Sequence, residues 1–127
     1  HRIWGNYGFN LLFSLVVHKS VKDLGSGLNL YKVKTLKSKY YIQYPDTLYF
    51  NDLMILASCY YKQKMMFYPI SWREEDQVSN NKLLNFSCSL LKMLWKYMKN
   101  KKNYIGQDMR TKKIDEYLVE EIYINQI

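Results

Sequence analysis

The chain has 127 residues, a formal net charge of +8 and a hydrophobic fraction of 48%. This length suits a single domain with one core, and so apolar a composition excludes an intrinsically disordered chain. The excess of basic residues favours an anionic partner, such as nucleic acid, a phosphorylated sugar or an acidic lipid surface, without choosing among them.

The first predicted element is an apolar helix over residues 3–17. The helical repeat puts Ile3, Tyr7 and Leu11 on one stripe, and neighbouring apolar residues widen it toward all-round hydrophobicity. We therefore expect this helix to be buried or to lie at an interface. Its longest apolar run, residues 11–17 with one serine, is far shorter than the roughly 18 residues of a membrane-spanning helix.

After this helix the sequence predicts a turn and two short extended segments. Gly25 and Gly27 allow backbone angles or close approaches that a side chain would forbid. Residues 28–31 alternate in the manner of a short strand. Residues 65–70 form a second apolar run, which we interpret as a strand at a sheet edge because Pro69 cannot donate to a ladder.

Between these two segments the sequence predicts one longer helix. Residues 34–39 form a basic short helix or loop, and Pro45 signals a turn before the next helix. Asp46 or Thr47 is the expected N-cap of that helix, which we place at about residues 48–63.

Two cysteines, Cys59 and Cys88, each lie in an apolar segment with helical character. Their setting favours two buried, reduced thiols over a disulfide or a pair of metal ligands. Reduced thiols in turn favour a cytosolic protein.

Residues 81–99 show the clearest amphipathic pattern in the chain, with an apolar stripe and a lysine-rich stripe on separate faces. The apolar stripe contains Leu83, Leu84, Leu90, Leu91, Leu94, Trp95 and Met98, and the other contains Lys82, Asn85, Ser89, Lys92, Lys96 and Lys99. The second stripe is either a solvated surface or, because Lys101 and Lys102 extend its charge, a face that contacts anionic headgroups. Residues 100–127 are expected to form a basic linker and a short C-terminal helix.

Several short motifs follow one another along residues 2–82. They are Arg2-x-x-Gly5-Asn6, an apolar helix, Val21-Lys22-Asp23-x-x-Ser26-Gly27-Leu28-Asn29-Leu30-Tyr31, a helix, a segment ending in Pro69-Ile70, and a loop that begins near Arg73. In this order they resemble family 2 glycosyltransferases of the GT-A fold, and most closely the polyprenyl-phosphate branch that is similar to dolichyl-phosphate mannose synthase. The resemblance implies an α/β fold. Residues 1–99 would be the acceptor-side, C-terminal half of a Rossmann-like catalytic domain, rich in helix with a few short strands.

The resemblance places the turn after the first helix beside the donor sugar and the acceptor. Its substrate-binding residues would be Asp23, Gly25, Ser26, Gly27 and Asn29. Backbone amides and small side chains in such a loop bind hydroxyls or phosphate. The family has an arginine where this chain has Asn29, so a charge contact to phosphate is not carried over. The alternative is a tight structural turn in which Asp23 caps its own backbone.

The resemblance also gives roles to three residues further along the chain. Asp52 would be the general base that takes a proton from the acceptor; alternatively, it is a first-turn acid favoured by the helix dipole. Arg73 would bind the diphosphate of the donor, with Gln77 in the same loop, and the alternative is an ordinary surface arginine. We expect Asp23, Asp52 and Arg73 to surround one open cleft.

Enzymes of this kind use a divalent metal, Mg or Mn, to hold the diphosphate of the nucleotide sugar. The chain contains no Asp-x-Asp motif, so the metal ligands are expected outside it. Because the chain begins at His1 rather than at a methionine, we interpret it as a piece of a longer protein that is inactive alone. Unpaired strand edges would then promote its association.

The function expected from the resemblance is transfer of a sugar from a nucleotide-sugar donor to a lipid-phosphate or glycan acceptor. The protein would be cytoplasmic and peripherally associated with an anionic membrane surface. The alternative is a basic, non-catalytic module that binds an anionic membrane or nucleic acid. Nucleic acid is the less favoured partner, because the aromatic residues fall in apolar stripes and the sequence has no RNP-like or helix-turn-helix signature.

Overall fold

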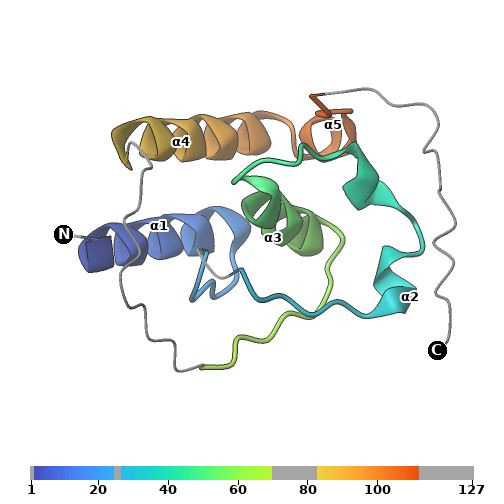
Figure 1. Ribbon diagram of the computed structural model, residues 1–127, viewed down its shortest axis with the longest axis horizontal. Helices are drawn as coiled ribbons and strands as arrows, with labels where there is room; N and C mark the ends of the chain where they lie inside the picture. Colours follow the sequence, from blue (N-terminus) through green and yellow to red (C-terminus); the bar gives the residue numbers. More distant parts are fainter. Residues whose placement is uncertain (1, 25–26, 70–82, 112–127) are drawn as a thin grey trace, which may run out of the picture.

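The computed structural model describes residues 2–24, 27–69 and 83–111. This part of the chain forms a set of helices joined by irregular connections (Figure 1). In chain order they are α1 (Arg2–Val17), α2 (Val33–Leu36), the 3-10 helix η1 (Tyr40–Gln43), α3 (Phe50–Tyr60), α4 (Leu83–Lys99) and α5 (Lys101–Gly106).

The two longest helices, α1 and α4, lie side by side and run in the same direction (Figure 1). α3 packs against α1 and α5, and α5 also packs against α4. α3 is the central helix, because Ile55 is the one residue between positions 52 and 59 that is not buried. A helix covered on nearly every side must be apolar nearly all round, which explains why this segment shows only a moderate amphipathic pattern.

The core forms where α1, α3, α4 and α5 meet. Its most deeply buried side chains are Phe13, Leu53, Met54, Leu56, Tyr97 and Ile105. The connection that contains η1 closes this core, since Tyr40 and Tyr44 are both buried. The Tyr44 hydroxyl donates a hydrogen bond to the carbonyl oxygen of Ile105 over 3.3 Å, which ties the middle of the chain to α5.

The expected α/β fold is wrong for the described residues, which are helical and contain no strand or sheet. Residues 28–31 and 65–69, expected as strands, form irregular connections instead. Leu28 and Leu30 are 68% and 95% exposed, whereas the second segment exposes Met66 and Tyr68 and packs Met65 and Phe67 partly against the core. Alternation of apolar and polar residues produces a strand only where one face is buried and a neighbouring strand completes the hydrogen bonds. The described residues therefore present no strand edge for association.

The middle helix is confirmed, but its ends differ from the prediction. α3 covers Phe50–Tyr60 rather than residues 48–63, and its N-cap residue, Tyr49, makes no capping hydrogen bond through its side chain. The carbonyl oxygen of Thr47 accepts from the amide of Phe50 over 3.0 Å, so a turn precedes the helix where the sequence predicts its first residues. Asp46 accepts a hydrogen bond from the Thr111 hydroxyl over 3.1 Å instead of capping.

The beginning of the segment expected as a basic linker forms α5. Asn100 is its N-cap, and the side-chain oxygen of Asn100 accepts a hydrogen bond from the amide of Asn103 over 3.0 Å. Asparagine is a preferred N-cap residue, so the sequence carries a local signal for this helix. Ile105 is 1% exposed, so α5 belongs to the same core as the preceding helices. The helix expected near the C-terminus lies outside the described residues.

Candidate functional site

Two side chains of α1 hydrogen-bond to residues 21–24, the segment that leads into the turn expected to bind substrate. Asn10 is 7% exposed, donates from Nδ2 to the carbonyl oxygen of Lys22 over 2.7 Å, and accepts from the amide of Leu24 over 3.1 Å. The Ser14 hydroxyl accepts from the amide of Val21 over 2.8 Å. Asn10 and Ser14 are polar residues four positions apart inside an apolar helix, and that spacing is the sequence signal for a shared role.

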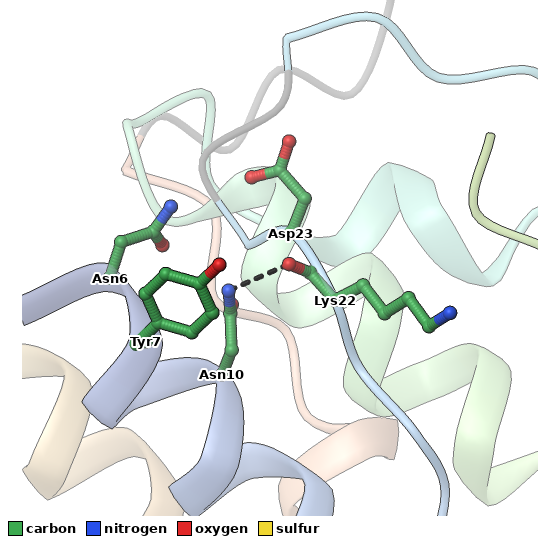
Figure 2. A pocket seen from close by; sticks show the side chains of 5 residues that line it. All are labelled: Asn6, Tyr7, Asn10, Lys22 and Asp23. Carbon is green, nitrogen blue, oxygen red and sulfur yellow. Dashed lines mark hydrogen bonds between the residues drawn. The ribbon is translucent and has the colours of Figure 1, made fainter. Parts of the chain in front are cut away.

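Asp23 lines a polar cavity of about 280 Å³ between α1 and this segment (Figure 2). Asn6, Tyr7, Asn10 and Lys22 complete the lining. The side chain of Lys22 points away from the cavity, while its carbonyl oxygen faces Asn10 (Figure 2). Both polar atoms of the Asn10 side chain already bind backbone groups, so a ligand here would meet Asn6, Tyr7 and Asp23.

Two other residues expected in the substrate-binding turn, Gly27 and Asn29, do not line this cavity. Gly27 and Asn29 are exposed, and a Cβ added at Gly27 would meet nothing within 4 Å. The backbone of Gly27 has no positive φ, so neither conformation nor close approach requires glycine at this position. Gly25, Ser26, Arg73 and Gln77 lie outside the described residues.

Asp52 lies in the first turn of α3 and is 2% exposed. Burial raises the pKa of its carboxyl to about 7, against a smaller lowering by a hydrogen bond with its own backbone. Such a pKa suits a general base, but an acceptor has no access to a side chain enclosed to this degree. Asp52 also does not line the cavity of Asp23, so the described structure does not bring these two carboxyls into one open cleft.

The metal-ligating side chains in the described ranges do not converge. Nowhere in these ranges do three His, Cys, Asp or Glu residues come together as a metal site requires. Mg or Mn with ligands outside this chain therefore stays a prediction. Cys59 is buried as expected, whereas the expectation for Cys88 is wrong because its position on α4 is exposed.

α4 carries more apolar surface than the core covers. Its buried side chains on one face are Leu90, Met93, Leu94 and Tyr97. A second set, Leu91, Trp95 and Met98, is 48%, 59% and 60% exposed. These three residues are spaced four and three positions apart and therefore share one side of the helix. We call them the exposed α4 stripe.

A row of lysines runs beside the exposed α4 stripe. Lys92, Lys96 and Lys99 have the same spacing and are exposed, and Lys101 and Lys102 continue the positive charge into α5. The ammonium nitrogen of Lys99 lies 4.4 Å from the centroid of the Trp95 ring, so the lysine row borders the stripe directly. Residues 83–107 contain no Asp or Glu, so α4 and α5 have no acid of their own to offset this charge.

The exposed α4 stripe meets α1 near the end of both helices. Met98 and Lys101 line a cavity of about 350 Å³ together with Leu15, Val16 and His18 of the facing segment. Leu15 is 62% exposed, so apolar surface continues from α4 onto α1. None of the helices in the described ranges combines the length and the apolarity that crossing a bilayer requires.

Comparison of the chain with protein-family models, with curated proteins and with solved structures found no match.

Proposed function

We propose that this protein is a non-catalytic module that binds anionic membrane surfaces through α4. The observation that carries the proposal is the position of the exposed α4 stripe directly beside a row of lysines, on helices without an acidic residue. An amphipathic helix of this kind lies in the plane of the membrane, with apolar side chains at the boundary between headgroups and acyl chains.

α4 has a buried face, the exposed α4 stripe and the lysine row, and each has a different role in such binding. The buried face holds the helix on the core through Leu94 and Tyr97, so α4 is already folded before it meets a membrane. Binding then does not include the cost of ordering a helix from a disordered segment. Trp95 offers a ring that is favoured at the headgroup level, and each lysine near an anionic surface contributes about 1 kcal/mol.

Nucleic acid fits this surface less well than a lipid headgroup layer. Leu91 and Met98 are aliphatic, and stacking with bases uses aromatic or guanidinium planes instead. Residues 83–107 contain no Arg, the residue that reads phosphate and base edges through two-point contacts. A bilayer boundary gives a partner to both the lysines and the aliphatic side chains.

Sugar transfer stays a prediction from the sequence resemblance. We favour the membrane-binding module because the α/β fold implied by that resemblance is absent from the described residues and Asp52 is enclosed.

The proposal is tested by flotation of the full chain with vesicles of phosphatidylcholine, alone or mixed with phosphatidylserine. We expect flotation with the anionic vesicles that weakens as salt is raised, because the lysines act through screened charge. The variant Trp95→Ser/Met98→Ser removes two members of the exposed stripe and is expected to abolish flotation. Its matched control is Leu48→Ser/Tyr68→Ser, which changes two side chains that are 63% and 73% exposed elsewhere.

A second pair of variants separates local charge from net charge. Lys92→Gln/Lys96→Gln is expected to weaken binding about fivefold per lysine, whereas Lys34→Gln/Lys37→Gln changes net charge equally away from α4 and leaves most binding intact. Equal losses in the two pairs would reject α4 as the binding face. Tight, steeply salt-dependent binding to duplex DNA without flotation would instead favour the nucleic-acid alternative.

A further inference from the structure

The cavity between the end of α1 and the junction of α4 with α5 has an amphiphilic lining. Leu15, Val16 and Met98 supply apolar wall, and His18 and Lys101 supply the polar groups. Its volume of about 350 Å³ lies at the lower end of the range of roughly 300–1,000 Å³ for small-molecule pockets. This space suits one headgroup with the adjoining part of a lipid rather than a whole acyl chain.

The local backbone places His18 and Lys101 at this cavity. α1 ends at Val17, and His18 follows with a φ of 53°, a left-handed conformation that reverses the chain at the cavity. On the other side, the non-helical backbone of Asn100 separates α4 from α5, and Lys101 is the first residue of α5. The ammonium nitrogen of Lys101 lies 5.5 Å from the centroid of the Tyr97 ring, and Tyr97 is 2% exposed. The position of Lys101 is therefore guided by a fixed aromatic side chain.

We propose that this cavity binds the phosphate headgroup of a single anionic phospholipid, with Lys101 and His18 at the phosphate and Leu15 and Met98 along the adjoining glycerol and first acyl carbons. This inference rests on the proposed function, because Met98 belongs both to the cavity and to the exposed α4 stripe. Charge complementarity selects the occupant: residues 1–22 and 83–107 contain no Asp or Glu, so α1, α4 and α5 carry no acidic side chain that would offset the charge of Lys101.

Phosphatidic acid is the sharpest probe, because its headgroup is a phosphate with no further substituent. The first experiment follows the Met98 methyl and His18 ring signals by NMR while the full chain is titrated with monomeric dihexanoyl phosphatidic acid. We expect saturable, one-to-one shifts at these residues, and at least about fivefold weaker binding of dihexanoyl phosphatidylcholine, which carries no net charge. Inorganic phosphate binding as tightly as the lipid would overturn the lipid as occupant.

The second experiment compares two neighbouring lysines of α5. Lys101→Gln is expected to weaken binding of the short-chain lipid about fivefold or more, whereas Lys102→Gln, which does not line the cavity, is expected to leave it unchanged. His18→Asn keeps a residue that tolerates the left-handed backbone and is expected to weaken binding without unfolding the chain. Equal effects of the two lysine variants, or the absence of saturable shifts, would overturn the inference.

The outcomes for the cavity and for the membrane face are distinguishable. If the protein binds the monomeric lipid saturably but does not float with vesicles, the lipid-binding cavity is supported and the membrane-binding function is contradicted. If flotation depends on Trp95 and Met98 but the monomeric lipid does not bind saturably, the membrane-binding function is supported and the lipid-binding cavity is contradicted.

Discussion

The side-chain oxygen of Asn10 accepts a hydrogen bond from the amide of Leu24 over 3.1 Å, across 14 positions of the chain. The Nδ2 of the same side chain donates to the carbonyl oxygen of Lys22. One buried residue of α1 thus satisfies two backbone groups of the following segment. This pair of bonds fixes the path of the chain on the side of α1 where the Asp23 cavity forms.

Replacing Asn10 tests this arrangement. Asn10→Ala is expected to lower the free energy of unfolding by about 1–3 kcal/mol, because the amide of Leu24 would stay buried without a partner. Asn6→Ala is the matched control, since Asn6 is exposed on the same helix and its loss is expected to cost about 0.5 kcal/mol or less. Urea unfolding of the three proteins measures both values, and equal stabilities of the two variants would contradict the role of Asn10.

The buried carboxyl of Asp52 predicts a pH-dependent stability. Its pKa is raised from 3.8 to about 7 in the folded protein, so between these values the folded state holds a proton that the unfolded state has lost. The contribution of Asp52 is therefore most favourable below about pH 4, falls as the pH rises toward 7 and is lowest above that. Titration of Asp52 lowers the free energy of unfolding by at most about 1.4 kcal/mol for each pH unit.

The variant Asp52→Asn isolates this effect, because an amide of similar shape does not ionise. The decline in unfolding free energy between pH 5 and pH 8, expected at roughly 1–3 kcal/mol in the parent protein, is expected to shrink in the variant. Urea unfolding at both pH values measures it. The same decline in both proteins would assign it to other groups.

Two neighbouring leucines of α4 test the division between its buried and exposed faces. Leu94 is 3% exposed and Leu91 is 48% exposed. Leu94→Ala is expected to cost about 2–5 kcal/mol of stability, because it leaves a cavity in the hydrophobic core. Leu91→Ala is expected to stay within about 0.5 kcal/mol of the parent protein. Similar costs for both substitutions, measured by thermal or urea unfolding, would place Leu91 in the core.

The two thiols are expected to differ in reactivity, one reacting in the folded protein and the other only after unfolding. Cys88 is exposed and is expected to react with a thiol reagent in the native protein. Cys59 is buried, and burial raises the pKa of its thiol despite a smaller opposite effect of Lys19, so its reaction is expected only after denaturation. Counting labelled cysteines by mass spectrometry, with and without urea, checks this order. Rapid labelling of both thiols in native buffer would contradict the packing of α3.

Residues close together in the sequence account for most of the elements that the sequence predicts correctly. α4 was predictable because lysines and apolar residues recur at helical spacing through one continuous segment. The start of α5 also has a local signal, Asn100, although the surrounding lysines favour a linker. The strands predicted at residues 28–31 and 65–70 depend on more than local sequence. A strand needs a second segment to complete its hydrogen bonds, and alternation alone does not supply one.

The candidate surfaces depended far more on tertiary structure. The sequence shows one broad apolar stripe on α4, but packing against α1 and α5 within the common core decided that Leu94 and Tyr97 are covered while Trp95 and Met98 are exposed. Packing likewise enclosed Asp52 and left Cys88 exposed. These outcomes follow from the neighbours that the fold supplies, and residue type does not specify them.

By itself the sequence determined the basic charge, the long helices and the lysine row, because each follows from composition or from a repeat of three to four residues. Only the tertiary structure decided which apolar side chains stay exposed and which polar groups meet across the chain. The Tyr44 hydroxyl and the Ile105 carbonyl are 61 positions apart, and such a contact depends on how the whole core assembles. Hydrophobic burial is non-directional, so a sequence pattern specifies that a face will be covered without specifying by what.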